Sequence, residues 1–211
     1  HLSRSSQLAN PGLGAVAAQQ GLIYAGIAIP ESDNYLAQGL EHLETETGEQ
    51  VLPDGGHVSR NPYTQLRLLR AFLEIREALK AAHIDLPNWL KTVIEQMVPM
   101  TRASRLGDGE LVCFHGGGGG ERAEIDMILA KSKIKGKPAL IAPHTKFHRL
   151  SAGKTTLVRA LLDEAAANGT ADIDAVNGQC RYLQIDSAVF VGHWSGYHEP
   201  TATKGVFSDG T

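Results

Sequence analysis

Two stretches with helical hydrophobic spacing flank a short polar segment, and this arrangement constrains the fold more than any other feature of the sequence. The spaced positions are Leu36, Leu40 and Leu43 before the segment and Leu66, Leu69 and Leu73 after it. Residues three or four positions apart share one face of a helix, so each stretch predicts an amphipathic helix. Consecutive amphipathic helices with short connections pack as antiparallel hairpins, which predicts a helical part built in this way.

Capping and helix-breaking residues set the expected limits of the helices. Pro30 ends the first helix, Ser32 or Asp33 caps the second, and Asn88 caps the fourth. Pro62 suits the first turn of the third helix because its missing N–H would have no partner there. The expected helices span residues 15–29, 33–48, 62–79, 88–97 and 121–130.

After Arg105 the helical spacing gives way to short apolar runs separated by glycine. The run over 111–114 is followed by His115 and five consecutive glycines, Gly116 to Gly120. Residues 139–142 and the alternating stretch 180–191 predict strands, whereas residues 155–167 have the spacing of a helix. The tail from Gly192 predicts turns or β-structure. We therefore expect a helical segment, 1–104, and a second segment, 105–211, that contains a linker and is rich in β-structure.

Composition and charge argue against several classes of partner. The 211 residues are 42% hydrophobic and 20% charged, as in an ordinary globular protein. The formal net charge of −3 argues against nucleic acid held on a basic face, and no apolar run approaches the roughly 18 residues of a membrane span. Cys113 and Cys180 fit neither a disulfide framework nor a zinc motif, so the cellular location stays open. The start at His1 predicts a fragment of a longer protein.

The polar segment between the second and third helices, residues 52–63, concentrates reactive side chains. Its imidazole, hydroxyl, guanidinium, carboxamide and phenol belong to His57, Ser59, Arg60, Asn61 and Tyr63. Loops held by a rigid scaffold often carry binding and catalytic groups. Helix-start chemistry alone also accounts for these residue types, but no other segment is as dense, and we favour a functional site here.

Other local patterns are less specific. Ser151–Thr156 is similar to half of a phosphate-binding P-loop, but His148 stands where the full motif needs a glycine, so nucleotide binding is the weaker alternative. The glycine run either brings backbone close to a ligand or is a flexible loop. His144 and His148 have the i, i+4 spacing of metal ligands on a helix, which Pro143 disfavours, so we expect isolated surface histidines and no metal site.

Four sets of motifs occur in order and at regular intervals along the first three quarters of the chain. They are Gln50–Pro62 with Gln65–Leu66 and Leu68–Arg70, Pro87–Leu90 with Met97–Met100, Gly107–Gly109 with Phe114–Gly118, and Ala142–His144 with Arg149–Thr155. Together they resemble the bacterial heparinase II/III-like family, over residues 1–156. Residues 157–211 have no match to the family pattern.

The resemblance implies an incomplete α/α toroid of helical hairpins that leads into the start of an antiparallel β-sandwich. Characterised members of the family are polysaccharide lyases that cleave uronic-acid-containing polymers, such as glycosaminoglycans or alginate, by β-elimination. A polar or cationic group neutralises the uronate carboxylate, a base removes the C5 proton, and a Tyr or His protonates the leaving oxygen. The implied partner is an acidic polysaccharide, no cofactor is expected, and a structural divalent metal and the oligomeric state stay open.

The resemblance also implies roles for individual residues. Asn61 or Arg60 would neutralise the carboxylate, His57 has a pKa suited to base work near neutral pH, and Tyr63 would act as acid or base. His115 would reach the sugar from the facing loop. Substrate-binding roles fall to Gly116, Gly117, His144 and Arg149. Which of these groups removes the proton stays open.

Two departures from the family pattern qualify these roles. Family members often have Asn at the position of His115 and Tyr at the position of Phe147, so a candidate proton donor is missing. The helical spacing of residues 155–167 also conflicts with the strand that a β-sandwich needs there. A carbohydrate-binding or structural protein of the same fold, without turnover, is therefore the main alternative to a lyase.

Overall fold

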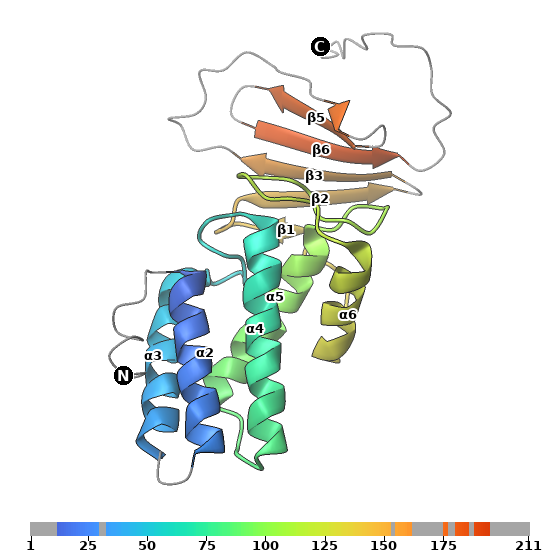
Figure 1. Ribbon diagram of the computed structural model, residues 1–211. Coiled ribbons are helices and arrows are strands. Elements are labelled where there is room, and N and C mark those ends of the chain that lie inside the picture. Colours follow the sequence, from blue (N-terminus) through green and yellow to red (C-terminus); the bar gives the residue numbers. More distant parts are fainter. Residues whose placement is uncertain are drawn as a thin grey trace.

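A computed structural model describes residues 12–29, 33–152, 155–161, 175–176, 180–185 and 188–194. Helices form one part and an antiparallel sheet lies across their upper end (Figure 1). The helices are α2 (Leu13–Ala28), α3 (Asp33–Gln50), α4 (Pro62–Ala81), α5 (Asn88–Ala103) and α6 (Arg122–Ser132). All five predicted helices are confirmed, and α5 extends beyond its predicted end to Ala103.

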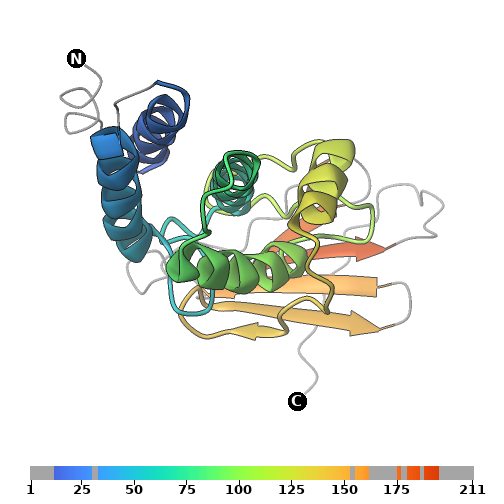
Figure 2. The ribbon, with the colours of Figure 1, turned by 90° about the horizontal axis from the view of Figure 1, so that it is seen from below.

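A shared hydrophobic core holds the helices together. Helix α2 packs against α3, and α4 packs against α2, α5 and α6, as the view in Figure 2 shows. On α4 the spaced apolar residues point into this core, and Leu66, Leu69, Phe72 and Leu73 are all buried. Burial of one such side chain stabilises the fold by about 1.5–3 kcal/mol. The stripe that is visible in the sequence is therefore the surface on which the hairpins pack.

One antiparallel sheet has the strand order β1-β2-β3-β6-β5-β4. Its strands are β1 (Ile141–Ala142), β2 (Phe147–Ala152), β3 (Thr155–Leu161), β4 (Ala175–Val176), β5 (Cys180–Ile185) and β6 (Ala188–Trp194). Strand β3 pairs with β2 on one side and with β6 on the other. The stretch predicted as one strand over 180–191 is thus β-structure, divided between the neighbouring strands β5 and β6.

A second, smaller core joins the sheet to the end of α5. It contains buried residues from the end of α5 and the chain after it, namely Met100, Ala103, Leu106, Val112 and Phe114, and from the sheet, namely Ala142, Phe147 and Val158. This contact brings the turn between β1 and β2 close to the loop before α4. Two segments far apart in the sequence therefore meet at one end of the helices.

The prediction of a helix over residues 155–167 is wrong, because residues 155–161 form strand β3. Val158 is buried in the second core, and its backbone pairs with Arg149 of β2 and Val191 of β6. Pairing on both sides satisfies the backbone in the extended form, which overrides the helical spacing of the leucines and alanines. A P-loop needs a helix at this point, so the nucleotide-binding alternative loses its structural basis. Residues 162–167 lie outside the described part.

Three smaller predictions need correction or lie outside the described part. Asn88 does not cap α5: Pro87 occupies the capping position, and the carbonyl of Asn88 accepts a hydrogen bond from Thr92 Oγ1. The strand predicted over 139–142 is only the two residues of β1. In the tail, β6 reaches Trp194, and residues 195–211 are outside the described part. None of the described helices has the length and apolar character of a membrane span.

Candidate functional site

The loop before α4, residues 51–61, is a compact turn pressed onto α5. Leu52 N donates to Gly56 O at 2.8 Å, and Val58 N donates to Gln50 O at 2.9 Å, so the loop closes on itself. Gly55 has a φ of 79° and lies so close to the carbonyl of Gln96 on α5 that a side chain has no room there. The helical core therefore fixes the backbone of this loop.

Asp54 ties the loop to the turn between β1 and β2. Its Oδ1 accepts from Thr145 Oγ1 at 2.6 Å and from Gly56 N at 3.1 Å. Its Oδ2 accepts from Thr145 N at 2.7 Å and from His144 N at 2.8 Å. Burial raises the pKa of Asp54, but these four hydrogen bonds outweigh it and hold the pKa below the ordinary value. The carboxylate is thus an anchor between two distant segments.

The sequence analysis did not identify Asp54 or Thr145 as part of the site. Asp before two glycines is an ordinary turn former, and its side chain does bond the amide of Gly56 in that manner. The second partner, Thr145, is 91 residues away in the chain, and no local pattern connects the two. Asp54 and Thr145 belong to the candidate site because they contact its residues: Asp54 bonds the amide of His144, and the carbonyl of Thr145 accepts from Arg60.

His57 is held inside the loop by hydrogen bonds to both ring nitrogens. Ser59 N donates to Nδ1 at 3.0 Å, with Ser59 Oγ at 2.8 Å, and Nε2 lies 3.1 Å from Gln50 Oε1. Because Nδ1 accepts from an amide, the neutral imidazole with its proton on Nε2 fits these partners. The residue is 6% exposed, and burial lowers the pKa of its imidazole. This geometry suits a residue that fixes the loop, and its predicted role as the base stays a prediction.

Asn61 joins the start of α4 to the glycine run. Its Oδ1 accepts from Tyr63 N at 2.9 Å and from Thr64 N at 3.1 Å, which caps the helix. Its Nδ2 donates to His115 O at 3.1 Å. Gly117 packs directly on this amide, and a Cβ there would lie 2.5 Å from Asn61 Oδ1. The predicted neighbours Asn61, His115 and Gly117 are therefore adjacent, and Gly116 adjoins them.

His115 is exposed and lies against Phe147 of β2. The two rings are 6.4 Å apart between centroids and nearly parallel, with an interplanar angle of 20°. Arg60 contacts the same phenyl ring, with its Cζ 5.9 Å from the centroid, and donates from Nε to Thr145 O at 2.9 Å. His144 is also exposed and lies in the turn between β1 and β2. Cationic and ionisable side chains thus gather around Phe147, where family members often have a tyrosine.

The cavity beneath this cluster is small. His57, Arg60, Asn61, Thr145 and Phe147 contribute to its lining. Its volume of about 10 Å³ is close to the least that holds one water molecule, so a sugar cannot enter it. A ligand at this site would therefore lie on the surface beside His115 and Arg60, which both contact Phe147.

Two predicted site residues lie elsewhere. Tyr63 does not line the cavity; its side chain faces a separate pocket between α2, α4 and α6. Arg149 is directed into the protein, where Nη1 donates to Ala103 O at 2.9 Å and to Arg105 O. Burial lowers the pKa of Arg149. These bonds hold β2 against the end of α5, so Arg149 has a structural role here and its predicted role in substrate binding stays a prediction.

The described residues contain no group of three or more His, Cys, Asp or Glu side chains that could hold a metal ion. His144 lies in a turn and His148 in strand β2, so their i, i+4 spacing is not on a helix. The site within the described part is thus built from imidazole, guanidinium and amide groups.

Comparison of the sequence with known protein families identifies the family of this chain. The profile described as Heparinase II/III N-terminus matches residues 9–115, just over half of the chain. The chain belongs to this family. A curated protein of similar sequence is FtsZ-localized protein C of Caulobacter vibrioides, 31% identical over 144 residues, which are 68% of this chain and 25% of that protein. The chain spans about a quarter of this relative.

Solved structures share the fold of this family member. Heparinase III matches with a TM-score of 0.61 and 14% identity, over 72% of this chain and 29% of that one. Heparan sulfate lyase HepC from Pedobacter heparinus matches with a TM-score of 0.56 and 18% identity, over 85% of this chain and 32% of that one. At these identities the likeness concerns the fold alone. The chain corresponds to about a third of each structure.

Proposed function

We propose that this family member is part of a polysaccharide lyase that cleaves a uronic-acid-containing polymer, such as a glycosaminoglycan or alginate, by β-elimination. The observation that carries the proposal is the bond from Asn61 to the carbonyl of His115, which sets an exposed imidazole beside Arg60 at the junction of helices and sheet. The names of the solved relatives, heparinase III and heparan sulfate lyase, supply the chemical class.

In this proposal each group at the surface of the site has its own task. Arg60, with His144, neutralises the uronate carboxylate and so acidifies the C5 proton. Neutral His115 takes that proton, the C4–O bond breaks, and the double bond forms between C4 and C5. The imidazolium of His115 then returns its proton to the leaving oxygen, so no separate tyrosine is needed. Asn61 holds the His115 loop in place, and His57 and Asp54 fix the backbone around it.

The architecture of the whole protein belongs to the same proposal. Helices α2 to α6 form part of an α/α toroid, and the sheet is one layer of a β-sandwich. The division into segments 1–104 and 105–211 follows from this reading. The supporting fact is that the chain matches about a third of heparinase III and of heparan sulfate lyase HepC, with TM-scores of 0.61 and 0.56.

A second candidate is a carbohydrate-binding protein of the same fold without turnover. It is favoured by one observation: the predicted base, His57, has both ring nitrogens bonded inside the loop, and the predicted acid, Tyr63, does not line the cavity. Under this reading the Arg60, His115 and His144 surface binds an acidic sugar but lacks a competent acid–base pair.

Incubation of the full-length protein with heparan sulfate, hyaluronan and alginate separates the two candidates. Elimination leaves a carbon–carbon double bond conjugated to the carboxylate, which absorbs in the ultraviolet. The lyase proposal expects a rise in absorbance that His115→Ala abolishes. Binding to one polymer without any rise, and weakened by His115→Ala, would establish the binding candidate instead. Absence of both binding and cleavage on every polymer would refute both.

A further inference from the structure

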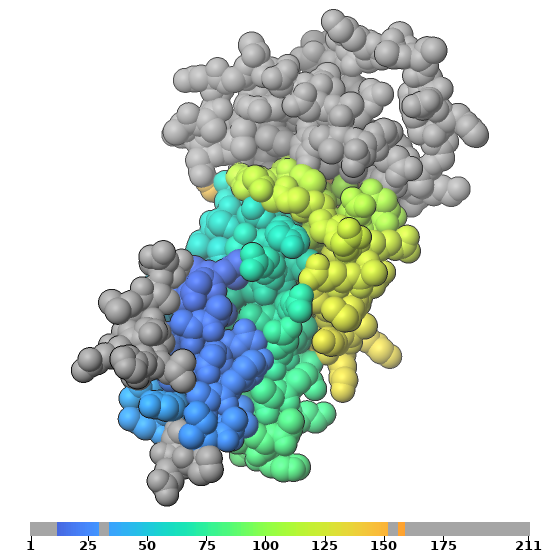
Figure 3. Space-filling model, in the orientation of Figure 1, coloured from blue at the N-terminus to red at the C-terminus, as the bar shows by residue number. Residues whose placement is uncertain are grey.

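A cavity larger than the one at the candidate site lies on the other side of the glycine run, between α2, α4 and α6. These helices lie side by side on the face shown in Figure 3. The cavity, named here the α4 pocket, has a volume of about 350 Å³. It is lined by Leu13, Val16, Ala17 and Gln20 of α2, Tyr63, Arg67, Arg70, Ala71 and Glu74 of α4, and Glu124 of α6. Its size is within the range of about 300–1,000 Å³ that is typical of ligand sites.

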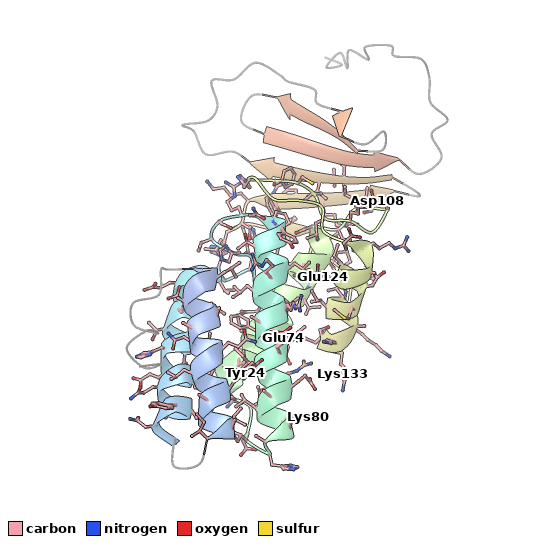
Figure 4. The ribbon with its side chains drawn as sticks, in the orientation of Figure 1. Tyr24, Glu74, Lys80, Asp108, Glu124 and Lys133 are labelled. Carbon is pink, nitrogen blue, oxygen red and sulfur yellow. The ribbon has the colours of Figure 1, made fainter. Side chains whose placement is uncertain are left out.

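The two acidic groups of the α4 pocket, Glu74 and Glu124, are both ion-paired with Arg70. Arg70 donates to Glu74 at 2.8 Å and to Glu124 at 2.9 Å, and Gln20 Nε2 donates to the second oxygen of Glu74 at 3.1 Å. Figure 4, in which Glu74 and Glu124 are labelled, shows these carboxylates on facing helices. Burial raises the pKa of Glu74, but the bonds from Arg70 and Gln20 hold it below the ordinary value. Glu74 therefore stays ionised at neutral pH, and both carboxylates are paired with Arg70.

Arg67 differs from Arg70 in having no ion pair with any residue in the described part of the chain. It is exposed and lines the α4 pocket one helical turn after Tyr63. An unpaired guanidinium beside a phenol ring, above an apolar wall from α2, offers the two contacts that an acidic sugar makes. A guanidinium binds a carboxylate with two parallel hydrogen bonds, and an aromatic ring packs on the sugar face.

The glycine run connects the α4 pocket to the candidate site. Gly117 packs on Asn61 at one end, and at the other end a Cβ on Gly120 would lie 3.6 Å from the ring of Tyr63. The run has no side chains, so its surface leaves room for a polymer that passes from His115 to Tyr63.

We propose that the α4 pocket is a second subsite for the same polymer, in which Arg67 binds the carboxylate of a uronic acid and Tyr63 packs against its ring. This inference rests on the proposed function and assigns Tyr63 to substrate binding instead of proton transfer. It also separates two properties: His115 acts on the bond that is cleaved, whereas Arg67 selects the neighbouring sugar by its charge.

The test is the affinity of the full-length protein for hexasaccharides prepared from heparan sulfate, hyaluronan and alginate, measured by calorimetry. Each is compared with its carboxyl-reduced counterpart. Arg67→Ala should weaken binding of the acidic form about tenfold, as expected for loss of one charged hydrogen-bonding group. Arg67→Gln, which keeps most of the side chain's bulk, should give a similar loss. The carboxyl-reduced form should bind wild type and both variants equally.

Lys80→Ala is the matched control, because Lys80 is a cation at the other end of the same helix, outside the pocket lining. It should leave the affinity within about twofold, as expected for a surface charge away from a ligand. Unchanged binding by Arg67→Ala and Arg67→Gln, with wild type still binding or cleaving the polymer, would overturn the subsite and leave the proposed function standing. Failure of wild type to bind any of the acidic hexasaccharides would overturn both.

Discussion

The two segments that meet at Asn61 contain a histidine each, and the structure treats them in opposite ways. His57 is buried in the loop before α4, with Gln50 and Ser59 bonded to its ring nitrogens. His115 is exposed on the glycine run, and its ring rests on Phe147. A dense set of reactive residue types therefore does not show which of them can reach a ligand. The loop before α4 uses its histidine to fix the backbone, whereas the glycine run exposes its histidine to solvent.

The largest expected effect is on catalysis by His115. His115→Ala should lower kcat/KM on the cleaved polymer by about 10²–10⁴-fold, because a positioned acid–base group contributes that much. The midpoint of thermal unfolding should change little, since the ring is exposed. Initial rates from product absorbance measure the effect, with His42→Ala on α3 as the control. A decrease in kcat/KM of less than about threefold would show that His115 is not the acid–base group.

Loss of the Asp54 anchor should have the next largest effect, on stability. Asp54→Ala removes a carboxylate that accepts four hydrogen bonds and leaves the amides of His144 and Thr145 without this acceptor. Hydrogen bonds to a charged group are worth about 1.5–3 kcal/mol each but do not add, so we expect a loss of about 3 kcal/mol in the free energy of unfolding.

Chemical denaturation measures that change in the free energy of unfolding. Asp108→Ala is the control, because Asp108 lies in a turn and accepts a bond from the amide of Glu110. A loss for Asp54→Ala no greater than that for Asp108→Ala would show that the turn between β1 and β2 is held by packing alone.

His57→Ala should destabilise the protein by about 2 kcal/mol, less than Asp54→Ala. The substitution leaves Gln50 Oε1 and Ser59 N without their ring partners, and an unpaired buried polar group costs about 1–3 kcal/mol. His115→Ala should stay within about 0.5 kcal/mol of wild type, as most exposed substitutions do. Equal losses in the free energy of unfolding for His57→Ala and His115→Ala would show that the two histidines do not differ in their structural role.

The smallest effect concerns the pH dependence of stability. Burial lowers the pKa of folded His57 below its ordinary value of 6.5, so below pH 6.5 the unfolded chain binds a proton that the folded chain does not. The stabilisation present above that pH is therefore lost as the pH falls below 6.5 towards the lower pKa of the folded protein. Thermal unfolding across this range should show the decline, and His57→Gln should reduce it while His115→Ala should not. An unchanged decline in His57→Gln would assign it to other groups.

The contribution of Asp54 falls in a separate window. Its pKa is lowered from 3.8 in the folded protein, so its stabilisation is complete above that value and is lost as the pH falls through the folded pKa. The two windows do not coincide, which allows the histidine and the carboxylate to be examined separately in one titration.

The sequence by itself determined the helices, the family and the neighbourhood of the site. Helical spacing and Pro62 are local signals, and α4 begins at Pro62 with Asn61 as its cap. The motifs around Asn61 and His115 also predicted two residues that prove to be adjacent. These features could be predicted because each depends on residues a few positions apart or on a family pattern.

Only the tertiary structure decided which side chains are available and how the second half pairs. Residues 155–161 have helical spacing but form β3, because β2 and β6 supply backbone partners on both sides. The exclusion of Tyr63 from the cavity, the burial of Arg149 and the bond between Asp54 and Thr145 depend on segments far apart in the chain. Local sequence was sufficient for the helices, whereas strand pairing, exposure and long-range hydrogen bonds depend on the distant segments that pack against a residue.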